Sequence, residues 1–174
     1  MRIFLVGFMG AGKSYLGKIW AKENSLHFYD LDEMIKQLEG LTIAEIFEKK
    51  GEDYFREKEK IALKKTATLQ NAIVACGGGT PIFFNNMQWM KENGTVVFLN
   101  ETVEKIILNI ANDKPLRPLI QNMNEAETNI FVRNKLAERI STYNQSHIIL
   151  STAQLHADAF KLIKYYTEIN LKNA

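Results

Sequence analysis

The stretch RIFLVGFMGAGKS, residues 2–14, decides the fold of this chain of 174 residues. Its apolar beginning, residues 2–6, is typical of a strand buried on both faces, and residues 12–24 predict the helix that follows. Between strand and helix, residues 7–14 fit the spacing G-x-x-x-x-G-K-[ST]. Glycines in such a loop let backbone N–H groups converge on phosphate oxygens, beside the positive end of the next helix. The stretch therefore predicts a P-loop that binds a nucleoside triphosphate.

The polar residues of this loop have separate parts in the interpretation. Lys13 places a positive charge on the β- and γ-phosphates, and the hydroxyl group of Ser14 is a ligand for Mg²⁺. The predicted nucleotide-binding residues of the loop are Gly10, Ala11, Gly12, Lys13, Ser14 and Tyr15. The alternative is an ordinary glycine-rich turn, and the match of both motif and context favours the P-loop. The motif indicates that a nucleoside triphosphate is bound, but it does not indicate the identity of the second substrate.

Composition argues against several other classes of protein. The chain has 22 basic and 20 acidic residues, and its net charge of +2 is too small to predict a nucleic-acid partner. Its one cysteine, Cys76, excludes a disulfide within the chain, and nothing indicates an oxidising compartment. The apolar N-terminal run is too short for a signal peptide, and no stretch approaches the ~18 apolar residues of a membrane span. We expect a soluble, cytoplasmic protein with no membrane partner.

Short apolar runs alternate with longer amphipathic segments along the chain. Strands are expected at residues 2–6, 27–30, 72–76, 95–99 and 147–150. Helices are expected at residues 12–24, 32–40, 42–50, 52–70, 85–91, 102–111, 126–143 and 153–169. This alternation predicts an α/β fold whose parallel sheet is covered by helices on both faces. No repeat or linker interrupts it, so we expect one domain over residues 1–174.

Residues 112–125 break this rhythm, because they contain Pro115 and Pro118 and show no clear period. A loop of this length inside a compact domain is typically functional or disordered. The functional interpretation is a lid that excludes water from an ATP site, and the alternative is a passive surface loop.

Two carboxylates, Asp30 and Asp32, come at the end of the second expected strand. Ligands of open α/β sheets bind at the carboxyl ends of the strands, beside the first phosphate loop. In an extended segment, side chains two residues apart point the same way. One carboxylate would then serve Mg²⁺ and the other would accept a proton from a substrate hydroxyl group. The alternative is that Asp32 only caps the next helix.

Three arginines have a planar guanidinium that suits a carboxylate or phosphate ligand. Arg56 has Glu59 one helical turn further on to orient it, Arg117 lies in the irregular loop, and Arg139 lies on the helix after that loop. Taken singly, each also fits a solvated surface residue. The run Gly77–Gly79 predicts either a tight turn or the close approach of a ligand to the backbone.

Taken together, these residues resemble the shikimate kinase family, a member of the nucleoside-monophosphate-kinase-like P-loop group. The similarity runs over nearly the whole length. It comprises, in order, GFMGAGKS at 7–14, FYDLD at 28–32, FR at 55–56, GGGT at 77–80, PLRPLI at 115–120 and ER at 138–139 followed by Tyr143. Many families share the P-loop, whereas this ordered set is much more specific.

The resemblance implies a three-layer P-loop kinase fold with a five-stranded parallel sheet in the order 2-3-1-4-5. It also implies a helical substrate-binding subdomain at about residues 32–70 and a lid at about residues 112–125. The implied reaction transfers the γ-phosphoryl group of ATP to the 3-hydroxyl of shikimate, on the route to chorismate and the aromatic amino acids. The implied substrates are thus shikimate and ATP with Mg²⁺, and a monomer is the family expectation.

The resemblance further implies roles for single residues. Asp32 matches the carboxylate that contacts the substrate hydroxyls and is the candidate base, while Asp30 matches the acid that serves Mg²⁺ with Ser14. Arg117 matches the lid arginine that reaches the transferring phosphate and also contacts the nucleotide, so the predicted catalytic set is Lys13, Asp32 and Arg117. The predicted substrate-binding residues are Asp32, Arg56, Gly77, Gly78, Gly79 and Arg139, of which the two arginines hold the shikimate carboxylate.

Two departures from the family pattern affect these implications. Residues 107–112 read ILNIAN, without the arginine that relatives often stack on adenine, so adenine recognition must use other groups. Ala75 and Cys76 supply no hydroxyl group before the triple glycine, where many relatives have a serine or threonine.

Two other functions remain as alternatives. A kinase for gluconate or for a nucleoside monophosphate shares the P-loop but is not expected to keep the rest of the ordered set. A nucleotide-binding module without catalysis predicts a damaged catalytic set, whereas Lys13, Asp30, Asp32 and Arg117 are all present. A protein-interaction domain has no positive evidence in the sequence.

Overall fold

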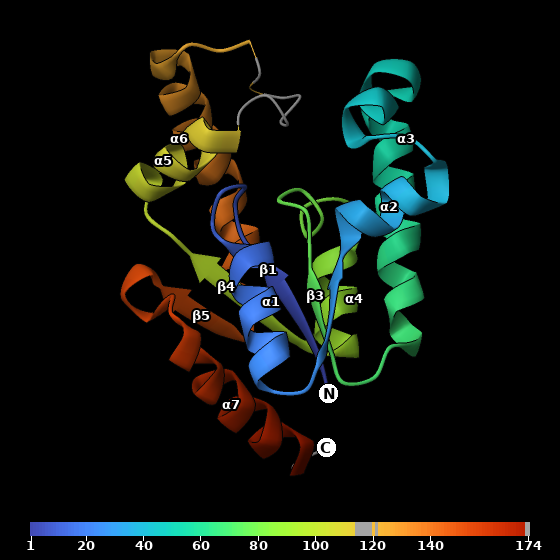
Figure 1. The fold of residues 1–174 in the computed structure, drawn as a ribbon, viewed down its shortest axis with the longest axis vertical. Coiled ribbons are helices and arrows are strands. Elements are labelled where there is room, and N and C mark those ends of the chain that lie inside the picture. The colour runs from blue at the N-terminus through green and yellow to red at the C-terminus, as the bar shows by residue number, and fades with distance from the viewer. Residues whose placement is uncertain (114–119, 121, 173–174) are drawn as a thin grey trace.

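A five-stranded parallel sheet forms the centre of the molecule (Figure 1). The structure is a computed structural model, and its description covers residues 1–113, 120 and 122–172. The strands are β1 (Arg2–Val6), β2 (His27–Asp30), β3 (Ala72–Ala75), β4 (Thr95–Asn100) and β5 (Ile148–Ser151). They lie in the order β2-β3-β1-β4-β5, and every neighbouring pair is parallel. The expected α/β class and strand order are confirmed.

Seven α-helices surround the sheet in the part of the chain that the structure describes. They are α1 (Lys13–Glu23), α2 (Leu31–Glu39), α3 (Ile43–Lys65), α4 (Asn86–Asn93), α5 (Val103–Asp113), α6 (Glu125–Tyr143) and α7 (Phe160–Lys172). Short 3₁₀ turns occupy Thr66–Thr68, Thr152–Gln154 and Ala157–Ala159. Among the described residues, no helix combines the length and the apolar character that crossing a bilayer requires.

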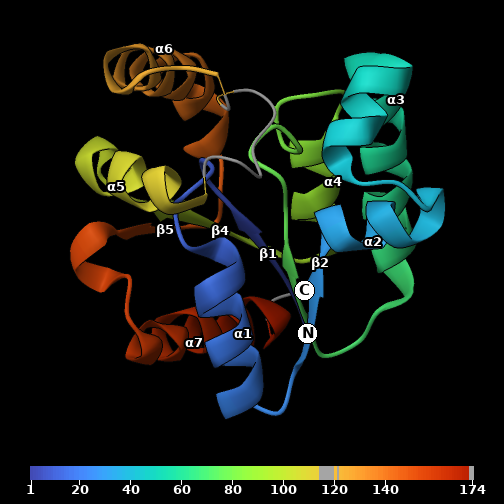
Figure 2. The same cartoon turned by 45° about the horizontal axis from the view of Figure 1, so that its top comes forward.

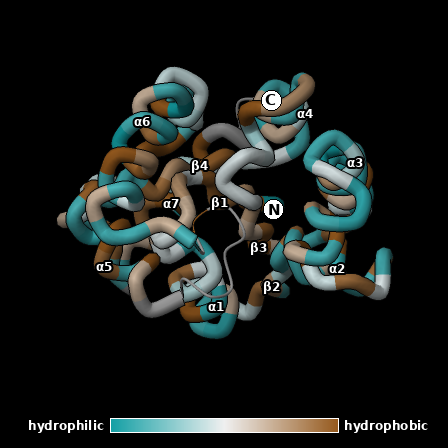
Figure 3. Tube along the Cα trace, turned by 90° about the horizontal axis from the view of Figure 1, so that it is seen from above, coloured by the Kyte–Doolittle hydropathy of each residue, from teal (hydrophilic) through white to brown (hydrophobic). Residues whose placement is uncertain are grey.

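Alternate residues of the central strand β1 face opposite layers, as the period of a strand requires. Ile3 and Leu5 belong to a core with Trp20 of α1 and Phe160 of α7. Phe4 and Val6 belong to a second core that includes residues of α3, α4 and α6. Figure 3 shows the hydrophobic strands at the centre and helices of mixed character around them. The sheet is therefore buried on both faces, which explains why β1 reads as a continuous apolar run.

A third, smaller core packs the P-loop against the two helices that flank the predicted lid. It consists of Phe8, Ile106, Ile110, Ile120 and Val132. In Figures 1 and 2, α5 and α6 rise together beyond the carboxyl ends of the strands on one side, and α2 and α3 rise on the other. The P-loop and the carboxyl ends of β2 and β3 lie between these two helix pairs.

The helices differ from the expectation in two places. The helices expected at residues 42–50 and 52–70 form α3, which is interrupted at Gly51 (φ 81°, ψ 171°) and gives way to a 3₁₀ turn after Lys65. The helix expected at residues 153–169 begins only at Phe160, so that prediction was wrong over its first turns. His156 there is extended (φ −137°, ψ 172°), and its carbonyl oxygen accepts a hydrogen bond from the indole of Trp20. The same carbonyl oxygen accepts from the N–H of Ala159 at 3.1 Å, so a 3₁₀ turn and not an α-helix follows His156.

Candidate active site

The P-loop, residues 7–14, connects β1 to α1 as predicted. Gly10 and Gly12 have φ values of 78° and 84°, in the left-handed region that glycine adopts without strain. A Cβ atom on Gly10 would lie 3.0 Å from the carbonyl oxygen of Ile106, so α5 also leaves no room for a side chain there. The Asn109 amide of α5 donates a hydrogen bond of 2.8 Å to the Gly10 carbonyl oxygen. The loop is thus held from its α5 side, by a contact that the sequence did not reveal.

Lys13 lies across its own loop. Its ammonium group donates hydrogen bonds of 2.8 Å to the carbonyl oxygens of Gly7 and Phe8. This position keeps a positive charge over the backbone that a phosphate group would approach, as the motif predicts. Ala11 is buried beneath the loop, whereas Tyr15, in the first turn of α1, is 71% exposed.

Ser14 and Asp30 form one hydrogen-bonded unit beside the P-loop. The Ser14 hydroxyl donates to Oδ2 of Asp30 at 2.6 Å, and Oδ1 of Asp30 accepts from the backbone N–H of Asp32 at 3.0 Å. Asp30 is therefore the N-cap of α2, the role that the alternative interpretation gave to Asp32. Asp32 lies in the first turn of α2, so the expectation of an extended segment with both carboxylates pointing the same way was wrong.

Asp32 has a strongly perturbed acidity. Burial raises its pKa from 3.8 to about 6, with the negative charges of Asp30 and Glu59 adding to the rise and Lys13 and Lys36 opposing it. A carboxylate with a pKa near 6 is largely ionised at neutral pH and is a far better proton acceptor than an ordinary aspartate. The structure thus gives Asp32 the acid–base property that a general base needs.

Four side chains contact the guanidinium group of Arg56, two by hydrogen bonds and two by their aromatic rings. Its Nε and Nη2 donate to Oε1 of Glu52 at 3.1 and 2.9 Å, and its Nη1 donates to Oε2 of Glu59 at 2.9 Å. The guanidinium carbon lies 5.0 Å from the ring centre of Phe55 and 4.3 Å from that of Phe83. These three hydrogen bonds use three of the five N–H donors of a guanidinium, and residues 1–113, 120 and 122–172 provide no acceptor for the other two.

Glu59 is fully buried and joins two parts of the site. Its Oε1 accepts a hydrogen bond of 2.6 Å from the hydroxyl of Thr80, while Oε2 accepts from Arg56. Burial raises the pKa of Glu59, and the positive charge of Arg56 opposes that rise. The prediction that Glu59 orients Arg56 is confirmed, whereas Thr80 and Phe83 were missed because neither is a near neighbour in sequence.

Each residue of the triple glycine lies against a different charged side chain. A Cβ atom on Gly77 would come within 2.6 Å of Oε1 of Glu59. On Gly79 it would lie 2.6 Å from Nη1 of Arg56, and on Gly78 it would lie 3.4 Å from Nη1 of Arg139. The run also makes a turn, since the N–H of residue 80 donates to the carbonyl oxygen of Gly77 at 3.1 Å. The predicted tight turn is therefore present, and at Gly77 and Gly79 a Cβ atom would meet the charged groups of Glu59 and Arg56.

The structure brings together nearly all of the predicted site. Around the carboxyl ends of β1, β2 and β3 lie Lys13, Ser14, Asp30, Asp32, Arg56, Gly77, Gly78, Gly79 and Arg139. Arg117 lies outside the described residues, as does half of the segment predicted to form the lid, residues 114–119 and 121. Neither Arg56 nor Arg139 is a solvated surface residue, because both are buried.

A parallel sheet of this strand order with a P-loop after β1 defines a P-loop kinase fold. The shikimate kinase of Acinetobacter baumannii in complex with shikimate superposes with a TM-score of 0.83 at 34% identity, over 99% of this chain and 93% of that one. The shikimate kinase of Bacteroides thetaiotaomicron gives a TM-score of 0.80 at 34% identity, over 87% and 85% of the two chains. A deoxyadenosine kinase of M. mycoides, at 17% identity and a TM-score of 0.55, shares the fold alone.

Sequence comparison narrows the class to one family. The sequence model described as shikimate kinase matches residues 9–168. The shikimate kinase of Azobacteroides pseudotrichonymphae genomovar. CFP2 is 42% identical over 149 residues, which are 85% of this chain and 88% of the relative. The chain belongs to the shikimate kinase family.

Proposed function

We propose that the protein is a shikimate kinase, which transfers the γ-phosphoryl group of ATP to the 3-hydroxyl of shikimate. The products are shikimate 3-phosphate and ADP, in the synthesis of chorismate and the aromatic amino acids. The observation that carries the proposal is the pair of buried arginines, Arg56 and Arg139, that flank Gly78 and Gly79 beside Asp32 and the P-loop. A small acceptor with one carboxylate and several hydroxyl groups matches this set of partners.

The acceptor would bind with its carboxylate between Arg56 and Arg139. Burial makes these guanidinium groups strong ligands for a carboxylate, because little water competes for their N–H donors. Gly77, Gly78 and Gly79 let the acceptor ring lie directly against the backbone. A substrate hydroxyl group would then face Asp32.

The transfer needs positioning and charge compensation more than covalent chemistry. Asp32 accepts the proton of the acceptor hydroxyl as that oxygen forms its bond to the γ-phosphorus, and the bond from phosphorus to the β-γ bridging oxygen breaks to release ADP. Lys13 and the backbone N–H groups of Gly10, Ala11 and Gly12 compensate the phosphate charge, with Tyr15 at the start of α1. Arg117 is proposed as the lid arginine that contacts the transferring group.

Ser14 and Asp30 fit the requirements of a Mg²⁺ site. Their side-chain oxygens lie 2.6 Å apart beside the P-loop, and Mg²⁺ commonly takes one or two protein oxygens together with phosphate and water. Among the described residues, no group of three or more His, Cys, Asp or Glu side chains gathers to form an all-protein metal site. Bound Mg²⁺ would supply charge neutralisation at the β- and γ-phosphates.

The remaining family expectations are part of the same proposal. Residues 1–174 would act as one domain and as a cytoplasmic monomer, with α2 and α3, about residues 32–70, as the acceptor-binding subdomain. The segment of about residues 112–125 would be the lid.

A comparison of acceptors tests the proposal. ADP release from MgATP is measured with shikimate, gluconate, a nucleoside monophosphate or no acceptor. We expect shikimate alone to stimulate release well above the rate without acceptor. The assignment would be refuted if another acceptor stimulated ADP release in place of shikimate. It would also be refuted if no acceptor stimulated ADP release by the folded protein.

The same assay separates the acceptor site from the nucleotide site. Arg56→Ala should raise the KM for shikimate about a hundredfold with little effect on the KM for ATP, since a buried charge-assisted contact contributes ~2–3 kcal/mol. Arg133→Ala is the matched control, because Arg133 is exposed on α6 and its one ion pair among the described residues is with Glu104. It should leave both KM values unchanged.

A further inference from the structure

Tyr143, at the end of α6, connects this helix to the triple glycine. Its side chain is fully buried, and its phenol donates a hydrogen bond of 2.6 Å to the carbonyl oxygen of Gly78. The ring packs on Phe98 of β4, with 5.0 Å between ring centres, so the position of the hydroxyl group is fixed by the core. Burial raises the pKa of Tyr143 to about 12, which keeps the phenol protonated and able to donate.

Arg139 lies one helical turn before Tyr143, on the same face of α6. Its Nη1 is 3.4 Å from the position that a Cβ atom on Gly78 would occupy. One face of α6 therefore meets Gly78 at two points, and the contact of Tyr143 is a hydrogen bond to the backbone.

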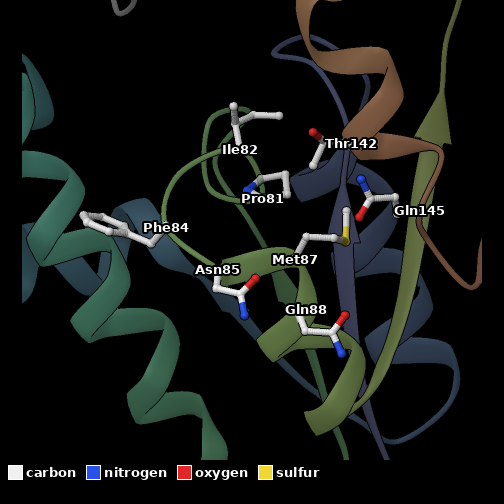
Figure 4. A pocket seen from close by; sticks show the side chains of 8 residues that line it. All are labelled: Pro81, Ile82, Phe84, Asn85, Met87, Gln88, Thr142 and Gln145. Atoms are coloured by element: carbon white, nitrogen blue, oxygen red, sulfur yellow. The ribbon is translucent and has the colours of Figure 1, made fainter.

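The bond from Tyr143 adds to the contacts that hold the triple glycine, because glycine has no side chain of its own that could pack. Gly78 and Gly79 have no side chains, and the peptide plane between two glycines is the one whose orientation the flanking φ and ψ angles restrict least. Beyond them, Pro81 and Ile82 are separated from Thr142 of α6 and from Gln145, just after this helix, by a hollow of about 260 Å³ (Figure 4). The loop is thus not wedged against α6 at this place.

The direction of the Gly78 carbonyl group sets the direction of the next N–H group. In a planar trans peptide, the carbonyl oxygen of Gly78 and the N–H of Gly79 point to opposite sides. Tyr143 holds the oxygen toward α6, so the N–H points away from α6, and Figures 1 and 2 show α3 on that other side of the loop. Arg56 of α3 lies against Gly79, as a Cβ atom there would be 2.6 Å from its Nη1.

The N–H of Gly79 has no hydrogen-bond acceptor among the residues that the structure describes. We infer that Tyr143 is a positioning residue, whose phenol fixes the Gly78–Gly79 peptide so that the Gly79 N–H joins Arg56 in binding the acceptor carboxylate. The inference rests on the proposed function, because it concerns the acceptor of that reaction. It adds a residue that touches neither substrate.

Tyr143→Phe tests the inference, because it removes one oxygen atom and keeps the packing on Phe98. We expect the KM for shikimate to rise about tenfold, the effect of one buried hydrogen bond, and the KM for ATP to change less than about twofold. The analogue of shikimate with a hydroxymethyl group in place of the carboxylate serves as an inhibitor in the same assay. Its inhibition constant should differ less than about twofold between the Tyr143→Phe variant and the wild type. Tyr165→Phe, at an exposed phenol on α7, is the control and should change nothing.

A merely structural role would give a different pattern. An unchanged KM for shikimate, an equal rise of both KM values, or an equal penalty for the analogue would overturn the inference. Wild-type protein that phosphorylates no shikimate would overturn the proposed function itself, and this is seen before any variant is compared. If the Tyr143→Phe protein does not fold, the amide proton resonance of Gly79 in the wild-type protein decides. It should move downfield with shikimate and not with the analogue, and an unmoved resonance would contradict the inference.

Discussion

At the scale of single residues, the protonation state of Asp32 that stabilises the fold differs from the one that a general base needs. Its pKa lies at about 6, above the ordinary 3.8, so the folded protein favours the protonated form and ionisation at neutral pH costs stability. The main cause is burial, and Asp30 and Glu59 add to it. A residue that served only the fold would be better neutral, whereas a general base must be ionised.

Asp32→Asn should therefore stabilise the protein while it abolishes phosphoryl transfer. The raised pKa gives the wild type a stabilisation that is complete below 3.8 and is lost as pH rises through 6. We expect a gain of about 1 kcal/mol at pH 7.5, less than the ~3 kcal/mol of the full shift because the side chain is partly exposed and screened by solvent. The gain should vanish toward pH 4.

Thermal unfolding of both proteins across this pH range provides the measurement. Asp53→Asn, an exposed substitution on α3, is the control and should change neither stability nor activity. If Asp32→Asn instead lowers the melting temperature at pH 7.5, the fold favours the ionised carboxylate and the prediction is wrong.

Some residue contacts of the site were predictable from sequence and others were not. Arg56 and Glu59 are three residues apart on a helix, so their contact follows from helical spacing. The stacking of Phe83 on Arg56 and the bond from Tyr143 to Gly78 join distant parts of the chain. No local period encodes such contacts, and they become visible only when the sheet has fixed the strand order.

At the scale of elements, one carboxylate holds α2 against α3. Glu39, near the end of α2, accepts hydrogen bonds from Lys58 at 2.8 Å, Tyr54 at 2.6 Å and Lys50 at 3.0 Å. Lys50 precedes the break at Gly51, and the other two donors follow it. The carboxylate thus connects the end of α2 to both parts of α3, on either side of Gly51.

Glu39→Gln should lower the melting temperature at pH 7, because it removes the charge that both lysines share. The hydrogen bonds of Lys58, Tyr54 and Lys50 lower the pKa of Glu39 to about 2. Its stabilisation is therefore complete above the ordinary pKa of 4.5 and is lost as pH falls toward 2. In thermal unfolding experiments, the difference in melting temperature between wild type and variant should shrink as the pH falls from 4.5 toward 2.

Glu33→Gln is the matched control, since Glu33 forms an exposed pair with Lys36 on the same helix. It should leave the melting temperature unchanged. A Glu39→Gln protein as stable as the wild type at pH 7 would contradict the bracing role of Glu39.

Most elements, though not all of their limits, were predictable. The five strands carry local signals and are confirmed, and the capping box of Thr42 with Glu45 at the start of α3 also has a local spacing. The late start of α7 was not predictable, because residues 153–159 have helical spacing but form parts of two 3₁₀ turns separated by the extended His156. Asp30 replaced Asp32 as N-cap because α2 begins directly where β2 ends.

At the scale of the whole molecule, the proposed acceptor site is shared by two helix pairs. Arg56 comes from α3 and Arg139 from α6, and the triple glycine lies between them. The core around Phe8 joins the P-loop to α5 and α6, and the guanidinium carbon of Arg139 lies 5.6 Å from the ring centre of Phe8. The nucleotide loop and one acceptor arginine thus belong to the same packed unit.

The central claim is that this arrangement moves a phosphoryl group from ATP to a hydroxyl group of shikimate. The direct measurement is ³¹P NMR of the protein with ATP, Mg²⁺ and shikimate. We predict that the γ-phosphate resonance is lost while ADP and a phosphomonoester, coupled to the proton on carbon 3 of the ring, appear at equal rates. ATP that stays intact, or that yields only inorganic phosphate, with folded protein and saturating shikimate would contradict the account.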